Sequence, residues 1–134
     1  MWPPEVERVV APLRGAGIEA RLEELPADED NLPPSGARAV AFDCAGRVVV
    51  ALVPPDRDAD AEKVAAATGS RPTRRVPAPQ FPYGEAAHVL VEQRLLTHET
   101  VWVEAGSPRH VLGLEPSVLA RLTRASPADL TRNG

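Results

Sequence analysis

The segment from residue 77 to 93, PAPQFPYGEAAHVLVEQ, holds the residue types best suited to a binding loop. Its prolines precede Tyr83 and Gly84, and an apolar run follows from His88. Proline fixes φ, and glycine lets another backbone or a ligand come close, so this pattern is typical of two structures. One is a tight surface turn. The other is a loop that holds backbone amides beside a ligand, and the segment by itself leaves both open.

A basic cluster precedes this segment. Arg71, Arg74 and Arg75 lie close together in the sequence, and Lys63 lies one predicted helix earlier. Arginine presents planar donors that match phosphate oxygens, so the cluster is the best candidate for phosphate binding. The alternative is an ordinary solvated face of the protein.

The histidines and the single cysteine give weaker signals. His88, His98 and His110 do not have the spacing of metal ligands, so we expect no metal site and place them at the surface or at strand edges. Cys44 beside Asp43 is a possible nucleophile, but no histidine is near in sequence, and a structural cysteine fits the hairpin position better. We also expect no cofactor.

Length and charge narrow the class of protein. A chain of 134 residues is expected to form one domain, 1–134, with a mobile tail from about residue 126. The net charge of −4 argues against a protein that coats DNA or RNA nonspecifically, but it allows a small pocket for the end of an RNA. One cysteine allows no internal disulfide, so a cytoplasmic location is expected, and no apolar run is long enough for a membrane span.

Apolar periodicity then predicts the elements that must position these residues. Helices are expected at 4–16, 58–69 and 116–125, and strands at 18–25, 37–43, 47–54, 74–76, 88–92, 99–106 and 110–114. Several hairpin-linked strands with about three flanking helices predict an α+β fold, with a curled mixed sheet or partial barrel.

Taken in order, several segments resemble the YbaK / prolyl-tRNA synthetase-associated domain, a family that hydrolyses mischarged aminoacyl-tRNA. The similarity covers nearly the whole chain, and it lies in the order of its pieces: GIEARLEEL, ARAVAFDCAGRVVVALVPPDRDADAEKVAAATGSR, FPYG, HVLVEQRLL and ETVWVEAGSPRHVLGLEPSVLARLTRAS. The resemblance implies the same curled sheet. It also implies a pocket for an aminoacyl group on the terminal adenosine of tRNA, where backbone amides would stabilise the developing oxyanion.

Carried over by position, the resemblance implies that Pro82, Gly84 and Gly106 line the pocket. The backbone from Pro82 to Gly84, which includes Tyr83, and that of Gly106 are therefore expected to bind substrate. Glu92 falls where the family ends a strand with aspartate.

The chain also departs from the family pattern. Arg38 stands at the position of the family's pocket lysine, so it becomes the candidate catalytic residue. The first loop glycine of the family aligns with Ala78 or Pro79, and two helices that wall the pocket are shortened to 26–36 and 77–80.

Two functions follow as expectations. The first is a freestanding aminoacyl-tRNA deacylase that serves translation fidelity; it would bind the 3′ end of aminoacyl-tRNA, with Arg71, Arg74 and Arg75 on phosphates and an aminoacyl-tRNA synthetase as a further partner. The second is a catalytically degenerate module that binds tRNA, a small ligand or a protein. A third alternative is an unrelated small enzyme that uses Cys44 or a histidine. No DNA or membrane partner is expected.

Overall fold

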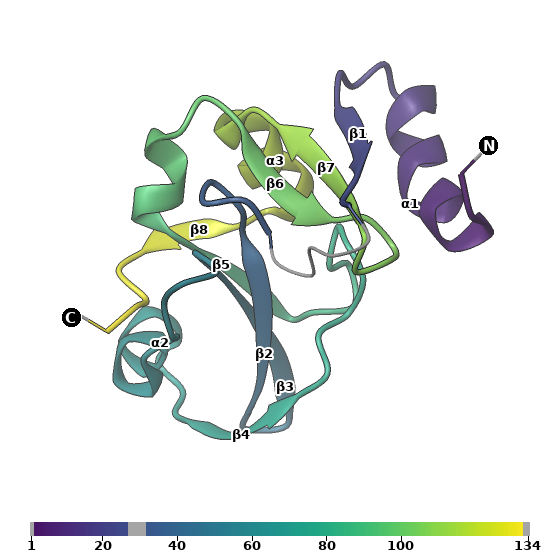
Figure 1. Ribbon diagram of the computed structural model, residues 1–134. Helices are drawn as coiled ribbons and strands as arrows, with labels where there is room; N and C mark the ends of the chain where they lie inside the picture. Colours follow the sequence, from purple (N-terminus) through teal and green to yellow (C-terminus); the bar gives the residue numbers. More distant parts are fainter. Residues whose placement is uncertain (1, 27–31, 133–134) are drawn as a thin grey trace.

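The computed structural model describes residues 2–26 and 32–132. Three α-helices, a short 3₁₀ helix and eight strands follow one another in this part of the chain (Figure 1). Their bounds are α1 Pro4–Gly15, β1 Arg21–Glu24, β2 Arg38–Cys44, β3 Arg47–Val53, α2 Ala61–Thr68, β4 Pro72–Val76, β5 His88–Glu92, η1 Gln93–Thr97, β6 Val101–Glu104, β7 His110–Leu114, α3 Pro116–Thr123 and β8 Ser126–Ala128.

The strands form two sheets, where one curled sheet was expected. The first has the order β1-β7-β6 and is antiparallel; the second has the order β4-β2-β3-β5-β8 and is mixed, because β5 runs parallel to both β3 and β8. The α+β class and the three helices are confirmed, and the sheets do not close into a barrel.

The two sheets are joined by the chain that leads into β2. The Ala37 N–H donates to the carbonyl of Trp102 (2.7 Å), and the Trp102 N–H donates to the carbonyl of Ser35 (3.2 Å). Residues 35–37 therefore extend the β6 edge of the first sheet, with a parallel bridge between Gly36 and Trp102, before the chain enters the second sheet as β2. One continuous segment, 35–44, thus contributes to both sheets in place of the single curled sheet that was expected.

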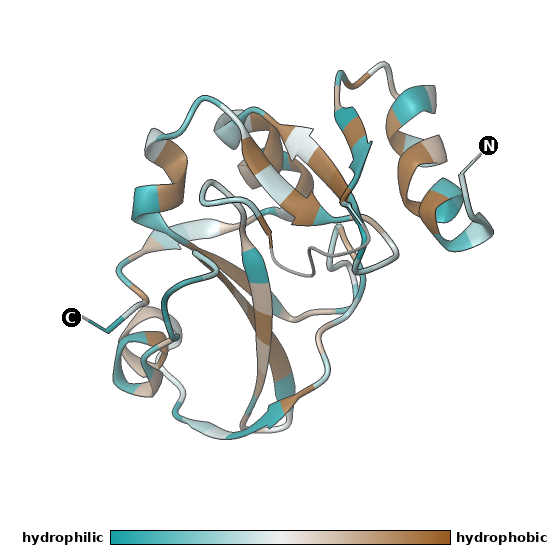
Figure 2. Cartoon of the chain, viewed as in Figure 1, coloured by the Kyte–Doolittle hydropathy of each residue, from teal (hydrophilic) through white to brown (hydrophobic). Residues whose placement is uncertain are grey.

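Side chains from both faces of the second sheet are buried. Along β3, Val50 and Leu52 point into the main core between the sheets, whereas Val49 and Ala51 pack beneath α2. Burial on both faces explains why β3 and β5 are continuous apolar runs, and these strands are among the brown, hydrophobic ribbons of Figure 2.

The chain after α3 contributes to the smaller core beneath α2. Ser126–Ala128 pairs with β5 as β8, and the Leu130 side chain is fully buried beside Val64 of α2. No element was expected beyond about residue 126, because SPADL has no strand periodicity and contains a proline. Proline is tolerated here because β8 is an edge strand.

Candidate functional site

A cavity of about 210 Å³ opens where β2 diverges from β6. Its walls are the first residues of β2, the segment 78–83, and the turn that follows β6. The lining residues are Leu32, Ala37, Arg38, Ala39, Ala78, Pro79, Gln80, Phe81, Tyr83, Glu104, Gly106, Ser107 and Pro108. The cavity thus brings together three segments that lie far apart in the sequence.

The edge of β2 offers unpaired backbone groups to this cavity. Ala45 and Gly46 form a two-residue turn with positive φ, which makes Cys44 and Arg47 a hydrogen-bonded pair. Alternation along the strand then directs the N–H and C=O of Ala39 away from β3. β4 pairs with β2 only as far as Ala41, so among the described residues no strand covers the backbone of Ala39.

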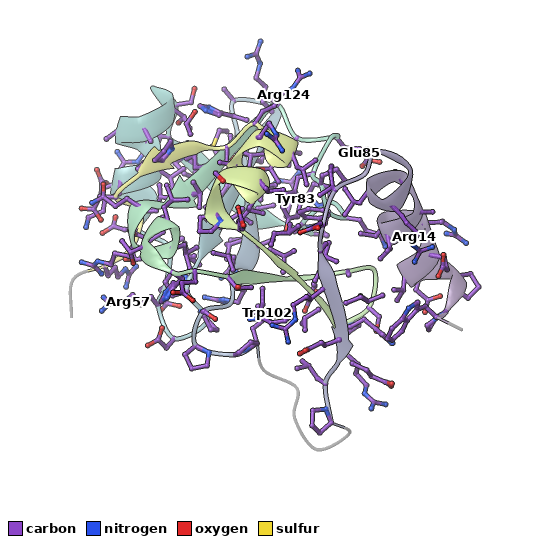
Figure 3. The ribbon with its side chains drawn as sticks, turned by 90° about the horizontal axis from the view of Figure 1, so that it is seen from above. Arg14, Arg57, Tyr83, Glu85, Trp102 and Arg124 are labelled. Atoms are coloured by element: carbon purple, nitrogen blue, oxygen red, sulfur yellow. The ribbon has the colours of Figure 1, made fainter. Side chains whose placement is uncertain are left out.

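Tyr83 fills the inner wall of the cavity. Its backbone has a φ of +66°, it follows a cis Phe81–Pro82 peptide bond, and its N–H donates to the carbonyl of Gln80 (2.7 Å). The rings of Phe81 and Tyr83 meet edge to face at 5.6 Å, and both side chains are buried. Figure 3 shows Tyr83 among the packed side chains of the interior.

Glu104 lines the same cavity from the end of β6. Partial burial raises the pKa of its carboxyl above the ordinary value for glutamate. The pKa of the Tyr83 phenol is raised too, first by burial and then by the negative charge of Glu104. The carboxylate and the phenol are therefore close enough to interact electrostatically, and the phenol stays protonated.

The turn after β6 adds backbone donors. Gly106 and Ser107 both line the cavity, and within residues 2–26 and 32–132 neither N–H donates a hydrogen bond. Gly106 also has a structural reason to be glycine. Its φ is +82°, and a Cβ at this position would collide with the Glu5 carbonyl of α1. Gly106 therefore serves the docking of α1 as well as the cavity wall.

Arg38 stands between this cavity and a second one. Val40 and Phe42 pack beneath α2, while Ala39 and Ala41 face the main core, so strand alternation places the Arg38 side chain on the α2 face. Its Nη2 donates to the carbonyl of Arg57 (2.9 Å) and lies 3.6 Å from Asp58 Oδ1. The buried Nε has no hydrogen-bond partner among the described residues.

The other residues assigned through the loop and the basic cluster lie outside this cavity. Pro82 and Gly84 are exposed and do not line it, although Tyr83 between them does. Arg71 and Arg74 are exposed and form ion pairs with Glu62 and Asp43. Arg75 is exposed on the opposite face of β4 from Arg74.

Glu92 has a structural position. Its side chain is fully buried at the end of β5, where Oε1 accepts from the Leu130 N–H (2.9 Å) and the Thr131 hydroxyl (3.4 Å). Oε2 accepts from the Arg94 N–H (2.8 Å) and so caps η1. Glu92 holds the last described residues of the chain to the second sheet.

His110 differs from expectation and Cys44 agrees with it. His110 is buried, not at the surface, because its ring packs edge to face against Trp2 at 5.6 Å. Cys44 is buried at the end of β2, and burial, with the nearby charge of Asp43, raises the pKa of its thiol. A raised thiol pKa lowers the thiolate fraction, so this cysteine is a poor nucleophile.

Two other kinds of site are not found in the part of the chain that the structure describes. No group of three or more potential metal ligands comes together there. No helix there has both the length and the apolar character needed to cross a membrane.

Glu104 and the backbone of Ala39 line the cavity but were not predicted from the sequence. In VWVE a glutamate at the end of an alternating strand is expected to face solvent, and Glu104 is exposed. The sequence does not indicate that it also lines a cavity together with residues of the segment 78–83. The backbone of Ala39 is free because β4 stops pairing with β2 at Ala41, and nothing in the sequence indicates where that pairing ends.

No family model and no curated protein matches this sequence. Solved structures do match the fold. A proposed trans-editing enzyme for prolyl-tRNA synthetase superposes with a TM-score of 0.86 at 21% identity, covering 99% of this chain and 100% of that one. A computationally designed epitope scaffold superposes with a TM-score of 0.85 at 20% identity, covering 99% of this chain and 100% of the scaffold. The hypothetical protein APE2540 superposes with a TM-score of 0.79 at 18% identity, covering 94% of this chain and 100% of APE2540.

Proposed function

Because this chain has the fold of the YbaK-type editing domain that its sequence resembles, we propose that it is a freestanding aminoacyl-tRNA deacylase acting in the cytoplasm. It would hydrolyse the ester between a wrong amino acid and the 3′ end of tRNA. The observation that carries the proposal is the cavity between β2 and β6, which combines unpaired backbone donors with one carboxylate. Similarity at this level of sequence identity supports the fold of an editing domain, whereas the cavity is what supports ester hydrolysis.

The groups around the cavity match an aminoacyl ester. Such an ester has a carbonyl oxygen that becomes negative during hydrolysis and an α-ammonium group that is positive. The N–H groups of Gly106 and Ser107 would hold the carbonyl oxygen, as an oxyanion hole does. The Glu104 carboxylate would bind the α-ammonium group. A volume of about 210 Å³ suits the aminoacyl group and leaves the adenosine outside.

Hydrolysis then needs a water molecule at the ester carbon. Water attacks the carbonyl carbon, the tetrahedral oxyanion forms against the backbone amides, and the C–O bond to the ribose breaks. The ribose oxygen leaves and takes up the proton released by the water. Positioning and preorganised amides lower the barrier without a strong side-chain base, so Arg38 has no required role as a base.

A panel of mischarged tRNAs tests this function. Wild-type protein should release at least one amino acid faster than the spontaneous rate, and charging with small amino acids should give the best substrates because the cavity is small. Release at only the spontaneous rate, for every aminoacyl group tried, would refute the proposal.

One observation favours a module that binds without hydrolysis. Arg38 stands at the family's lysine position, but its guanidinium is held by the Arg57 carbonyl and Asp58 on the far side of β2. If the lysine were essential, this chain would bind the RNA end and leave the ester intact. Arg38→Lys tests this alternative: if neither wild type nor Arg38→Lys releases an amino acid above the spontaneous rate while both still bind the RNA end, the binding module is supported, and hydrolysis by wild type rejects it.

A further inference from the structure

A second cavity, of about 310 Å³, lies on the α2 face of the second sheet, across Arg38 from the first. Its apolar floor comes from β2 and the start of α2. Its rim carries three arginines and one aspartate. The lining residues are Arg38, Val40, Phe42, Asp58, Ala59, Ala61, Arg75 and Arg132.

The three arginines come from three separate parts of the fold. Arg38 begins β2, Arg75 lies on β4, and Arg132 follows the buried residues of the C-terminal segment. Against their three positive charges stands one carboxylate, Asp58. Several guanidinium groups around one concave site are the arrangement that binds a phosphate group.

Two of these arginines are available for a ligand. Arg75 and Arg132 are exposed, and neither takes part in an ion pair within residues 2–26 and 32–132. Their neighbours differ, because Arg71 pairs with Glu62 and Arg74 with Asp43. Asp58 is already the partner of Arg38, at 3.6 Å.

The backbone beneath the site is held in place before any ligand arrives. The Asp60 N–H donates to the Leu130 carbonyl (2.7 Å), and the Arg132 N–H donates to the Asp58 carbonyl (3.3 Å). Ala59 and Thr131 form an antiparallel bridge between these hydrogen bonds. Residues 57–60 and 130–132 therefore form one fixed rim, so less conformational entropy is lost when a ligand binds.

We propose that this cavity binds a backbone phosphate of the RNA 3′ end, held by Arg38, Arg75 and Arg132. The inference rests on the proposed function, because Arg38 lines both cavities and so places the phosphate site directly beside the aminoacyl site. The 3′ nucleotide of an aminoacylated RNA in the first cavity would then run past Arg38 and place a phosphate in the second. Of the basic cluster 71–75, only Arg75 belongs to this site.

Binding of an uncharged RNA minihelix ending in CCA tests the site without requiring catalysis. Fluorescence anisotropy should show that Arg75→Gln and Arg132→Gln each weaken binding about tenfold and lower the slope of log K against log salt concentration by about 1. Asp58→Asn should strengthen binding severalfold, since it removes the only opposing charge among the described residues that line the cavity. This change of opposite sign separates the site from general loss of folded protein.

Arg14→Gln is the matched control, because it removes the same charge from α1. Figure 3 shows Arg14 and Arg57 at opposite sides of the molecule. If Arg14→Gln weakens binding as much as Arg132→Gln, or if the minihelix does not bind at all, the proposal is wrong. Inorganic phosphate is titrated in parallel: competition sensitive to Arg132→Gln supports a phosphate site, whereas phosphate binding without RNA binding overturns the RNA assignment. Deacylation of charged tRNA by wild type is measured separately, so failure of the enzyme and failure of this site are distinguishable.

Discussion

Glu104 is placed where its charge suits a ligand better than it suits the folded protein. Folding moves the carboxyl partly out of water beside the buried Tyr83, and the raised pKa of Glu104 records that penalty. A raised folded-state pKa means that the proton is bound more tightly in the folded chain. The contribution of Glu104 to stability is therefore largest in acid and is lost as pH rises through its raised pKa.

Glu104→Gln should separate function from stability. We expect kcat/KM for deacylation to fall about tenfold, mainly through KM, because the amide no longer attracts the α-ammonium group. Wild-type kcat/KM should fall in acid as the Glu104 carboxyl is protonated, and this fall should be absent in the variant. At neutral pH the variant should unfold at a slightly higher temperature, with a gain below about 1 kcal/mol because solvent screens this partly exposed group. A large loss of thermal stability would show that the carboxylate has a structural role instead.

Residue types predicted some positions of the cavity but not their side-chain directions. Tyr83 could be chosen from sequence because it lies between Pro82 and Gly84, the two loop positions that the resemblance assigns. Arg38 could be chosen only as a position, since its alignment does not reveal that the guanidinium contacts Arg57. Side-chain direction depends on neighbours that are distant in sequence.

At the scale of elements, Gly84 and Gly106 were both predicted to bind substrate from the same family resemblance, but the structure places them in different surroundings. Gly106 has a left-handed backbone and lies against the carbonyl of Glu5 in α1. At Gly84 the backbone φ is not positive, and a methyl group added to its Cα would meet no described atom within 4 Å beyond its chain neighbours. Of these two glycines, only Gly106 is required by the packing of an element.

Gly106→Ala and Gly84→Ala are therefore a matched pair. We expect Gly106→Ala to lower the free energy of unfolding by about 1–3 kcal/mol, because a strained backbone is combined with a clash against α1. Gly84→Ala should leave stability within about 0.5 kcal/mol of wild type. Denaturant unfolding gives both values. Equal losses in the two variants would contradict the close packing of α1 on the turn after β6.

Elements with local signals were predicted well. The hairpin of β2 and β3 follows from two apolar runs around Ala45-Gly46, and α2 follows from Asp60, whose side chain accepts from the Glu62 N–H (2.8 Å). The parallel pairing of β3 with β5 was not predicted, because it joins strands separated by a helix and a further strand. Pairing between strands so far apart in the sequence depends on how the side chains of the whole core pack together.

At the scale of the whole molecule, the C-terminal segment closes the smaller core. Leu130 is fully buried beneath α2, and Lys63 of α2 binds both Asp129 and the Thr131 carbonyl (2.7 Å). Glu92 fixes the same segment from β5. Two elements, α2 and β5, thus depend on residues that follow β8.

Leu130→Ala should therefore destabilise the protein strongly. Loss of a buried leucine with a residual cavity costs about 2–5 kcal/mol. Thermal unfolding followed by circular dichroism measures the effect, and Arg132→Gln, two residues later and exposed, should leave the midpoint nearly unchanged. A midpoint for Leu130→Ala equal to that of wild type would mean that this segment adds no core.

The strand that begins at the edge of β6 and continues as β2 has a consequence for unfolding. Residues 35–37 hydrogen-bond to the first sheet, and residues 38–44 are the second strand of the other. The two sheets cannot move apart without breaking the hydrogen bonds that residues 35–37 make to β6 or those that β2 makes to its neighbours. We therefore expect a single cooperative unfolding transition. Native-state hydrogen exchange should then give the amides of Ala37 and of β3 similar opening free energies. The cavity between β2 and β6 would then open only when the whole protein unfolds, so we expect it to keep its shape when a ligand enters.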